Sequence, residues 1–352
     1  MRLEFINRVK EKEVLGKSIL TNDGGVLLRA GVQLSEQYIS KLKTLGVLYV
    51  YIEDERLDDV MMEDERLVKL KQVAMKNMAK IIKNIHAANK AETRDSFRIV
   101  ENLIEYIIDA GDVNKSLYDI QTYDNYTYVH CLDTGIMSAF LGVSMNFSEC
   151  ELKGLGISAI LHDIGKTKIS SKIINKKGSL TDKEFLEIKK HPIYGRKILE
   201  NNIQIPTDIL KAVEQHHERV DGSGYPYGLS GNQISKYGKV VSICDVYDAI
   251  SNDRSYRNKF SPNEAYEMIL AGSGKMFDVD MVQNFKDTFA IYPLGCCVRL
   301  SNSIEGYVIK QNKGFPDRPI IRVLYEIETR KGIPFYEIDL LKHSDVVIES
   351  VV

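Results

Sequence analysis

Five of the seven histidines of this chain, together with two aspartates, fall at expected helix turns or ends between residues 130 and 245. The clearest segment is LHDIGK, residues 161–166, where an adjacent imidazole and carboxylate interrupt an apolar run. A packed core gains nothing from such a pair, whereas imidazole and carboxylate together are metal ligands. We therefore expect a fold that brings the whole set together. The set is His130, His162, Asp163, His191, His216, His217 and Asp245.

Seven nitrogen and oxygen ligands exceed the needs of one ion and suit two divalent ions that share a bridging carboxylate. Because no thiolate is among them, they favour Fe or Mn, with Zn, Ni and Co as alternatives. Two such ions about 3.5–4 Å apart can polarise a phosphodiester and hold a bridging hydroxide as nucleophile. Each feature alone has a simpler interpretation, such as a chance histidine pair on a helix surface. Their joint occurrence in one helical region indicates a metal site.

The composition is that of an ordinary globular protein. The 352 residues allow two or three domains, with 44% hydrophobic and 27% charged residues. The N-terminus lacks the apolar core of a signal peptide, and no apolar run is long enough for a membrane span, so we expect a cytoplasmic protein. A net charge of −2 gives no electrostatic case for nucleic-acid binding. The five cysteines form no CxxC pair and predict reduced, mostly buried thiols.

The hydrophobic pattern changes along the chain and predicts four regions. The first region has short strands around one helix, which Ser35 would cap. Long amphipathic helices follow, and we expect them to connect the flanking domains, to transmit a signal or to pair two subunits as a homodimer. Helical patterns then continue, including a capping box at Thr181 and Glu184, until a β-rich pattern follows Pro293. The expected regions are a small α/β domain at 1–60, a helical linker or hairpin at 61–115, a helical catalytic domain at 116–288 and a β-rich segment at 289–352.

Three segments together resemble the HD-GYP family, a branch of the HD phosphohydrolase superfamily. They are HDIGK, HHERVDGSGYP and DVYDAISNDRSYR, and the resemblance covers residues 116–288. It implies a mainly α fold, a helical bundle with the metals inside. It also implies hydrolysis of cyclic di-GMP or a related cyclic dinucleotide, with pGpG and then GMP as products.

The resemblance also assigns roles to the candidate ligands. His130, His162, Asp163 and Asp245 would bind one metal, and His191, His216 and His217 would complete the second. Asp163 would bridge the two ions. Lys166 follows one turn after the His-Asp pair, and the resemblance implies that it contacts the scissile phosphate or the bridging hydroxide, where a cation stabilises developing charge.

Other positions carry weaker expectations. Arg254 and Arg257 are candidates for clamping phosphate, because arginine binds it in a bidentate manner, and surface ion pairs are the alternative. Tyr225 of the GYP element packs against substrate or fills the core, and Asp221 orders its loop. Some family members carry a glutamate one turn before the first histidine and bind a third metal. This chain has Tyr126 there, which favours two metals.

The leading hypothesis is a metal-dependent phosphodiesterase of cyclic di-GMP that acts through a metal-bridging hydroxide. An HD phosphohydrolase for another cyclic dinucleotide or nucleotide is one alternative. A second is a non-catalytic sensor that binds the messenger, but every expected ligand position is filled. A third is an oxygenase with the HD fold, which the DGSGYP and DRSYR elements disfavour.

Overall fold

The computed structural model describes most of the chain. The stretches outside the description are residues 22–23, 61–64, 88–89, 111–114, 117–126, 177, 201–204, 253–261, 313 and 327–330. Three residues with predicted roles, Tyr126, Arg254 and Arg257, lie outside the described residues, so their roles stay predictions.

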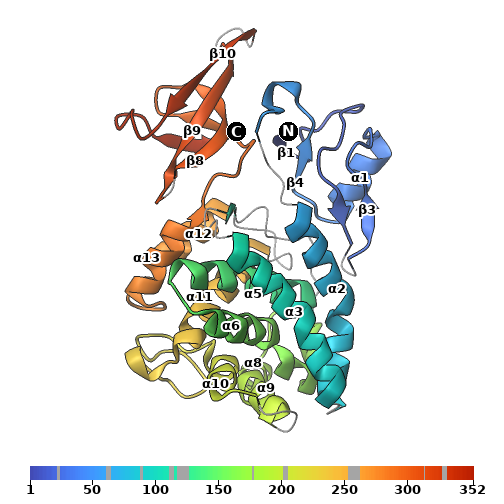
Figure 1. Ribbon diagram of the computed structural model, residues 1–352, viewed down its shortest axis with the longest axis vertical. Coiled ribbons are helices and arrows are strands. Elements are labelled where there is room, and N and C mark those ends of the chain that lie inside the picture. Colours follow the sequence, from blue (N-terminus) through green and yellow to red (C-terminus); the bar gives the residue numbers. More distant parts are fainter. Residues whose placement is uncertain are drawn as a thin grey trace.

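Helices dominate the middle of the chain, which confirms the predicted mainly α fold (Figure 1). The helices from the linker onward are α2 (Glu65–His86), α3 (Lys90–Ala110), α5 (Thr127–Ser144), α6 (Glu149–Leu161), α7 (Ser171–Ile174), α8 (Asp182–Ile188), α9 (His191–Glu200), α10 (Thr207–Gln215), α11 (Lys236–Asn252), α12 (Pro262–Ala271) and α13 (Val279–Thr288). Short 3₁₀ turns lie at η1 (Glu55–Leu57), η2 (Ile164–Lys168) and η3 (Gly231–Gln233).

Helix α5 forms the centre of the bundle and is buried continuously from Cys131 to Gly142. Helices α6 and α11 pack against it, and α2 and α3 cover it from outside with their apolar faces. The apolar faces of α2 and α3 that the amphipathic spacing predicts thus pack against the bundle of the same chain. A homodimer through residues 61–115 stays a prediction.

Local sequence signals explain where several helices begin. Ser148 and Glu151 form a capping box at the start of α6, and Thr181 and Glu184 form the predicted one at α8. In each box a hydroxyl accepts from the backbone N–H three residues on, and the glutamate accepts from the backbone N–H of the cap residue.

Among the described residues, no helix combines the length and the apolar character that a membrane crossing requires.

The N-terminal unit contains two small antiparallel pairs around one helix. One pair joins β2 to β3, and Ser35 accepts a hydrogen bond from the Tyr38 N–H as the predicted N-cap. The elements are β1 (Arg2–Phe5), β2 (Ile19–Leu20), β3 (Val26–Leu28), α1 (Glu36–Thr44) and β4 (Tyr49–Ile52), with β1 paired to β4.

The C-terminal segment forms an antiparallel sheet of five strands in the order β10-β9-β8-β7-β11. Its strands are β7 (Cys297–Leu300), β8 (Glu305–Asn312), β9 (Phe315–Tyr325), β10 (Gly332–Asp339) and β11 (Ile348–Val351). A separate parallel pair joins β5 (Lys115–Ser116) to β6 (Phe289–Ala290), at the two ends of the predicted catalytic region.

The N-terminal unit and the C-terminal sheet lie side by side at one end of the bundle (Figure 1). Leu3 and Leu57 share an apolar core with strands of the C-terminal sheet. The Arg322 guanidinium also reaches back, with nitrogens 2.6 and 2.7 Å from the Asp59 carboxylate. Two regions far apart in the sequence therefore stabilise each other. The region boundaries themselves stay predictions.

Candidate metal centre

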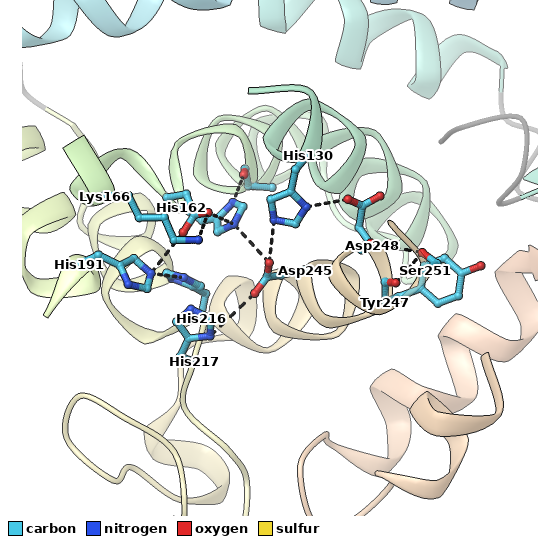
Figure 2. Close-up of polar contacts among 12 residues, drawn as sticks. His130, His162, Lys166, His191, His216, His217, Asp245, Tyr247, Asp248 and Ser251 are labelled. Atoms are coloured by element: carbon cyan, nitrogen blue, oxygen red, sulfur yellow. Dashed lines mark hydrogen bonds and ion pairs between the residues drawn. The ribbon is translucent and has the colours of Figure 1, made fainter. Parts of the chain in front are cut away.

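Helix ends place most of the candidate ligands. His162 is the C-cap of α6, and Asp163 follows it as the N-cap of η2. His191 begins α9, and His216 is the C-cap of α10. His130 and Asp245 lie within α5 and α11, the two helices that pass the cluster on its other side. His217 follows His216 directly. The structure thus brings all seven predicted ligands into one cluster (Figure 2).

Gly165 of LHDIGK lets η2 approach the start of α9. A Cβ at this position would lie 1.9 Å from the carbonyl oxygen of His191 and 2.5 Å from the Gly195 nitrogen. A larger residue would push the two segments apart. The glycine thereby allows the Asp163 carboxylate to lie 3.3 Å from Nε2 of His191.

The seven side chains form two groups that meet at Asp163. One group contains Asp163, His191, His216 and His217, and the other contains His130, His162 and Asp245; within each, the potential ligand atoms lie within 4.8 Å of one another. Asp163 Oδ1 lies 3.3 Å from His191 Nε2, and its Oδ2 lies 3.6 Å from His162 Nε2. The two oxygens of one carboxylate therefore face different groups.

Three of the imidazoles are oriented by the same backbone contact. Nδ1 of His162, His191 and His216 lies 2.6, 2.8 and 2.8 Å from the carbonyl oxygen three residues earlier. A carbonyl only accepts, so each Nδ1 carries the proton and each Nε2 presents a lone pair. This is the arrangement by which proteins orient histidine for metal binding.

Two of the inward atoms lack hydrogen-bond partners, as expected of metal ligands. His162 Nε2 and Asp163 Oδ1 are buried and have none among the described residues. Nε2 of His191 and Nε2 of His216 lie only 3.1 Å apart. Buried polar atoms without partners are costly, and lone pairs at this distance repel each other. Divalent cations would relieve both penalties, so these residues fit a metal centre.

The charge states also suit cation binding. Burial opposes ionisation of Asp163 and Asp245. Lys166 and imidazoles outweigh burial at Asp163, and the imidazoles of His130 and His162 outweigh it at Asp245, so both carboxyl pKa values lie well below their usual range. Burial lowers the pKa of His216 well below its usual value and that of His217 to about 3. At neutral pH the cluster therefore offers two carboxylates and, at His216 and His217, neutral imidazoles.

Lys166 lies at the edge of this cluster and is partly exposed. Its ammonium forms an ion pair with Asp163, one 3₁₀ turn earlier. Burial lowers the pKa of Lys166, but the Asp163 carboxylate outweighs that effect and raises it. A permanent cation is therefore held beside the carboxylate that joins the two groups.

Asp248 is a site residue that the sequence analysis missed. Its carboxylate lies 2.6 Å from Nδ1 of His130, whose Nε2 lies 2.9 Å from Asp245 (Figure 2). Burial lowers the pKa of His130, but hydrogen bonds to both aspartates outweigh it and raise it. The signal was present in the sequence, because Asp248 follows Asp245 by three residues on the same helix and so shares its face.

Cys131 is a second neighbour that the sequence analysis did not single out. Its sulfur lies within 4.8 Å of ligand atoms of His162 and Asp163. Burial raises the pKa of its thiol well above the usual value. A protonated thiol is a poor metal ligand, so the donor set remains imidazole and carboxylate.

The DGSGYP loop is built from specific contacts around Gly224. A Cβ there would lie 2.4 Å from the Arg219 nitrogen, so the loop closes tightly on the residues after His217. Asp221 accepts from the Ser223 N–H at 2.9 Å and so orders the loop as predicted. The ring of Tyr225 stacks on His217, with centroids 4.6 Å apart and planes inclined by 29°. The GYP element thereby forms one wall of the metal centre.

Comparisons with known proteins agree with this geometry. Residues 131–281 match the HD domain model, and residues 297–352 match a KOW domain associated with the HD domain. A Pseudomonas aeruginosa protein named cyclic di-GMP phosphodiesterase is 31% identical over 71% of this chain and 60% of its own length. A Thermotoga maritima protein of the same name is 36% identical over 46% of this chain and 44% of its own length.

Two further relatives extend the comparison. A Vibrio cholerae protein named 3'3'-cGAMP-specific phosphodiesterase 2 is 29% identical over 51% of this chain and 36% of its own length. A solved HD-GYP-type protein of Bdellovibrio bacteriovorus superposes with a TM-score of 0.50 at 17% identity, covering 81% of this chain and 98% of that one. This chain spans between 36% and 60% of the length of the three curated relatives.

The helical bundle and its converging histidines and aspartates define an HD-domain protein. With the GYP element on the wall of that centre and these relatives, the chain resembles the HD-GYP branch of HD-domain proteins. The resemblance seen in the sequence is thereby confirmed.

Proposed function

We propose that this chain is a metal-dependent phosphodiesterase that hydrolyses cyclic di-GMP to pGpG, GMP or both. The observation that carries the proposal is the convergence of buried imidazoles and carboxylates, among which His162 Nε2 and Asp163 Oδ1 lack hydrogen-bond partners among the described residues. The names of the relatives from Pseudomonas aeruginosa and Thermotoga maritima support the choice of substrate.

We assign the ligands to two divalent ions. His130, His162, Asp163 and Asp245 would hold one, and His191, His216 and His217 would hold the other, with Asp163 shared. The placement of the two Asp163 oxygens toward different groups supports the shared role. The donor set of imidazole and carboxylate favours Fe or Mn, with Zn, Ni and Co as alternatives.

Bound at these positions, two divalent ions would polarise a phosphodiester and acidify the attacking water. Residues of the chain would stabilise the developing charge and bind the substrate. Asp163 holds the Lys166 ammonium at the edge of the cluster, where it would stabilise charge that develops on the phosphate or protonate the leaving oxygen. Arg254 and Arg257 would clamp phosphate, and Tyr225 would contact the substrate from the wall of the centre.

A second candidate substrate is 3'3'-cGAMP, another cyclic dinucleotide. The Vibrio cholerae relative that carries this name supports it. Both substrates present the same phosphodiester chemistry and differ in one base, so the metal centre alone does not choose between them.

A chromatographic assay tests the proposal. The protein would be prepared anaerobically, reconstituted with Fe or Mn, and incubated with cyclic di-GMP and separately with 3'3'-cGAMP, with metal content measured on the same sample. We expect conversion of cyclic di-GMP with about two ions per chain, and loss of both turnover and bound metal in Asp163→Ala. Two bound ions without hydrolysis of either dinucleotide would reject the proposal, and turnover by Asp163→Ala with both ions bound would reject the shared ligand.

A further inference from the structure

A cavity of about 190 Å³ opens directly beside the metal centre. His217 lines it, so one side chain belongs both to the cavity and to the candidate ligand set. The volume lies below the roughly 300–1,000 Å³ of pockets that enclose a drug-sized ligand. The cavity therefore suits one part of a dinucleotide and not the whole molecule.

Two cations line this cavity, Lys189 at the end of α8 and Arg219 in the loop after His217. Neither forms an ion pair with a carboxylate of the described residues. Two cations that do not line the cavity are paired, by contrast. Lys190 lies 2.6 Å from Glu187, and Arg196 lies 2.7 Å from Glu200. The cations that face the cavity are thus the ones left available for an anion.

Aromatic rings complete the wall around Lys189. Its ammonium lies 4.8 Å from the ring centroid of Phe185 and 5.3 Å from that of Tyr225. Phe185 is 47% exposed although it is a large apolar residue, and Phe277 lines the cavity from the buried side. A cation between two ring faces is a combination that attracts both phosphate and a flat heterocycle.

We infer that this cavity is the subsite for the half of the cyclic dinucleotide that is not being cleaved. The inference rests on the proposed function, in which the metal centre engages one phosphodiester. The second phosphate of the ring would then meet Lys189 and Arg219, and the attached base would stack on Phe185 or Tyr225. Lys189 and Phe185 become residues that determine specificity for dinucleotides over smaller phosphodiesters.

Paired variants on α8 and its end test the subsite. Lys189→Met removes the cavity cation and keeps the apolar stem, and Lys190→Met is the matched control because Lys190 is exposed and paired with Glu187. Phe185→Ala removes the exposed ring, and Leu186→Ala, at a neighbouring side chain that is 58% exposed and does not line the cavity, is its control.

Two measurements would be made on each manganese-loaded protein. One is the Kd for a phosphorothioate analogue of cyclic di-GMP that resists hydrolysis, by calorimetry. The other is the hydrolysis of bis(p-nitrophenyl) phosphate, which is too small to span both the metal centre and the cavity. We expect Lys189→Met and Phe185→Ala each to weaken analogue binding about tenfold or more, with a much smaller effect on the small substrate. Both controls should match the wild type.

The outcomes separate the inference from the proposed function. Unchanged Kd values in both cavity variants would overturn the subsite, as would equal losses on the dinucleotide and the small substrate. Wild-type protein that binds the analogue through Lys189 but hydrolyses no phosphodiester would retain the subsite and reject the enzymatic function. Wild-type protein that hydrolyses cyclic di-GMP, while Lys189→Met and Phe185→Ala bind the analogue as tightly as the wild type does, would retain the enzymatic function and reject the subsite.

Discussion

Nδ1 of His130 and a carboxylate oxygen of Asp248 lie 2.6 Å apart, in a pair that joins α5 to α11. The Asp248 side chain is completely buried. Its position fixes the ring of His130 so that Nε2 points toward Asp245 and the neighbouring ring of His162. The metal centre thus has a supporting carboxylate behind one of its candidate ligands.

Replacing Asp248 with Asn should weaken metal binding. The amide keeps the size of the side chain but loses the negative charge. That charge orients the ring of His130 and makes its Nε2 a stronger electron-pair donor to a metal ion. Loss of such a partner lowers metal affinity by about 10–100-fold. Competition titration with a chelator would measure this, and Asp287→Asn, at an exposed position on α13, is the control. Equal affinities in wild type and Asp248→Asn would show that His130 needs no support.

Replacing Lys166 with Met should separate catalysis from metal binding. The ammonium is a partner of Asp163 and not a ligand itself, so we expect metal content near that of the wild type. Loss of a charge that stabilises the transition state typically lowers kcat by about 10²–10³-fold. Lys168→Met, at an exposed position two residues on, should retain activity. Full activity in Lys166→Met would remove this residue from the mechanism.

Much of the fold could be predicted because it follows from local patterns. Apolar spacing indicates α2 and α3, capping residues indicate the starts of α1 and α8, and alternation indicates the C-terminal strands. The candidate ligands could be predicted from chemistry alone, since imidazoles and carboxylates had no other reason to gather in an apolar helical region. These signals are local in the sequence.

What escaped prediction depends on long-range packing. No local pattern tells that Leu3 shares a core with the C-terminal sheet, because that contact joins opposite ends of the chain. Cys131 looks like any buried thiol until α5 is placed beside η2. Asp248 had a spacing signal, but its role depends on the distance to His130, which only the packing of α11 on α5 sets.

Replacing Gly165 with Ala should destabilise the protein and impair the centre. The added Cβ would lie 1.9 Å from the His191 carbonyl oxygen, so η2 must move away from α9. We expect a lower midpoint of thermal unfolding and fewer bound ions per chain. Gly332→Ala is the matched control, because a Cβ there has no neighbour within 4 Å. If Gly165→Ala binds both metals with wild-type affinity, the close approach is not required.

Acid should destabilise the metal-free protein before the carboxylates titrate. The pKa of His217 is about 3 in the folded state against about 6.5 when unfolded. Between these values the unfolded chain binds a proton that the folded chain does not, so the free energy of unfolding falls as pH falls. His130 acts in the opposite sense. Its raised pKa contributes stability below about pH 6.5 that is lost as pH rises through the folded value.

Urea unfolding of the metal-free protein between about pH 4.5 and 7 would measure this dependence. His217→Gln should flatten the decline of stability toward acid, because it removes one of the groups that take up a proton on unfolding. His343→Gln, at an exposed position in the C-terminal segment, should leave the slope unchanged. Identical slopes in wild type and His217→Gln would contradict the assignment of a buried neutral imidazole.

The ion pair between Lys71 and Asp133 should hold α2 onto the bundle. Lys71 Nζ lies 2.7 Å from Asp133 Oδ1, and the two side chains are 9% and 0% exposed. Asp133 follows His130 by three residues on α5, so this contact stabilises the helix that carries a candidate ligand. Lys71→Met leaves a buried carboxylate without its cation, which typically costs about 3–5 kcal/mol.

Chemical denaturation of Lys71→Met would measure that loss, with Lys80→Met at an exposed position of α2 as the control. The double variant Lys71→Met/Asp133→Leu removes both charges and fills the space with apolar atoms. Because an apolar pair can replace a buried ion pair at little cost, we expect it to recover most of the lost stability. A double variant as unstable as Lys71→Met would show that the pair matters for its hydrogen bonds and geometry and not for the balance of charge.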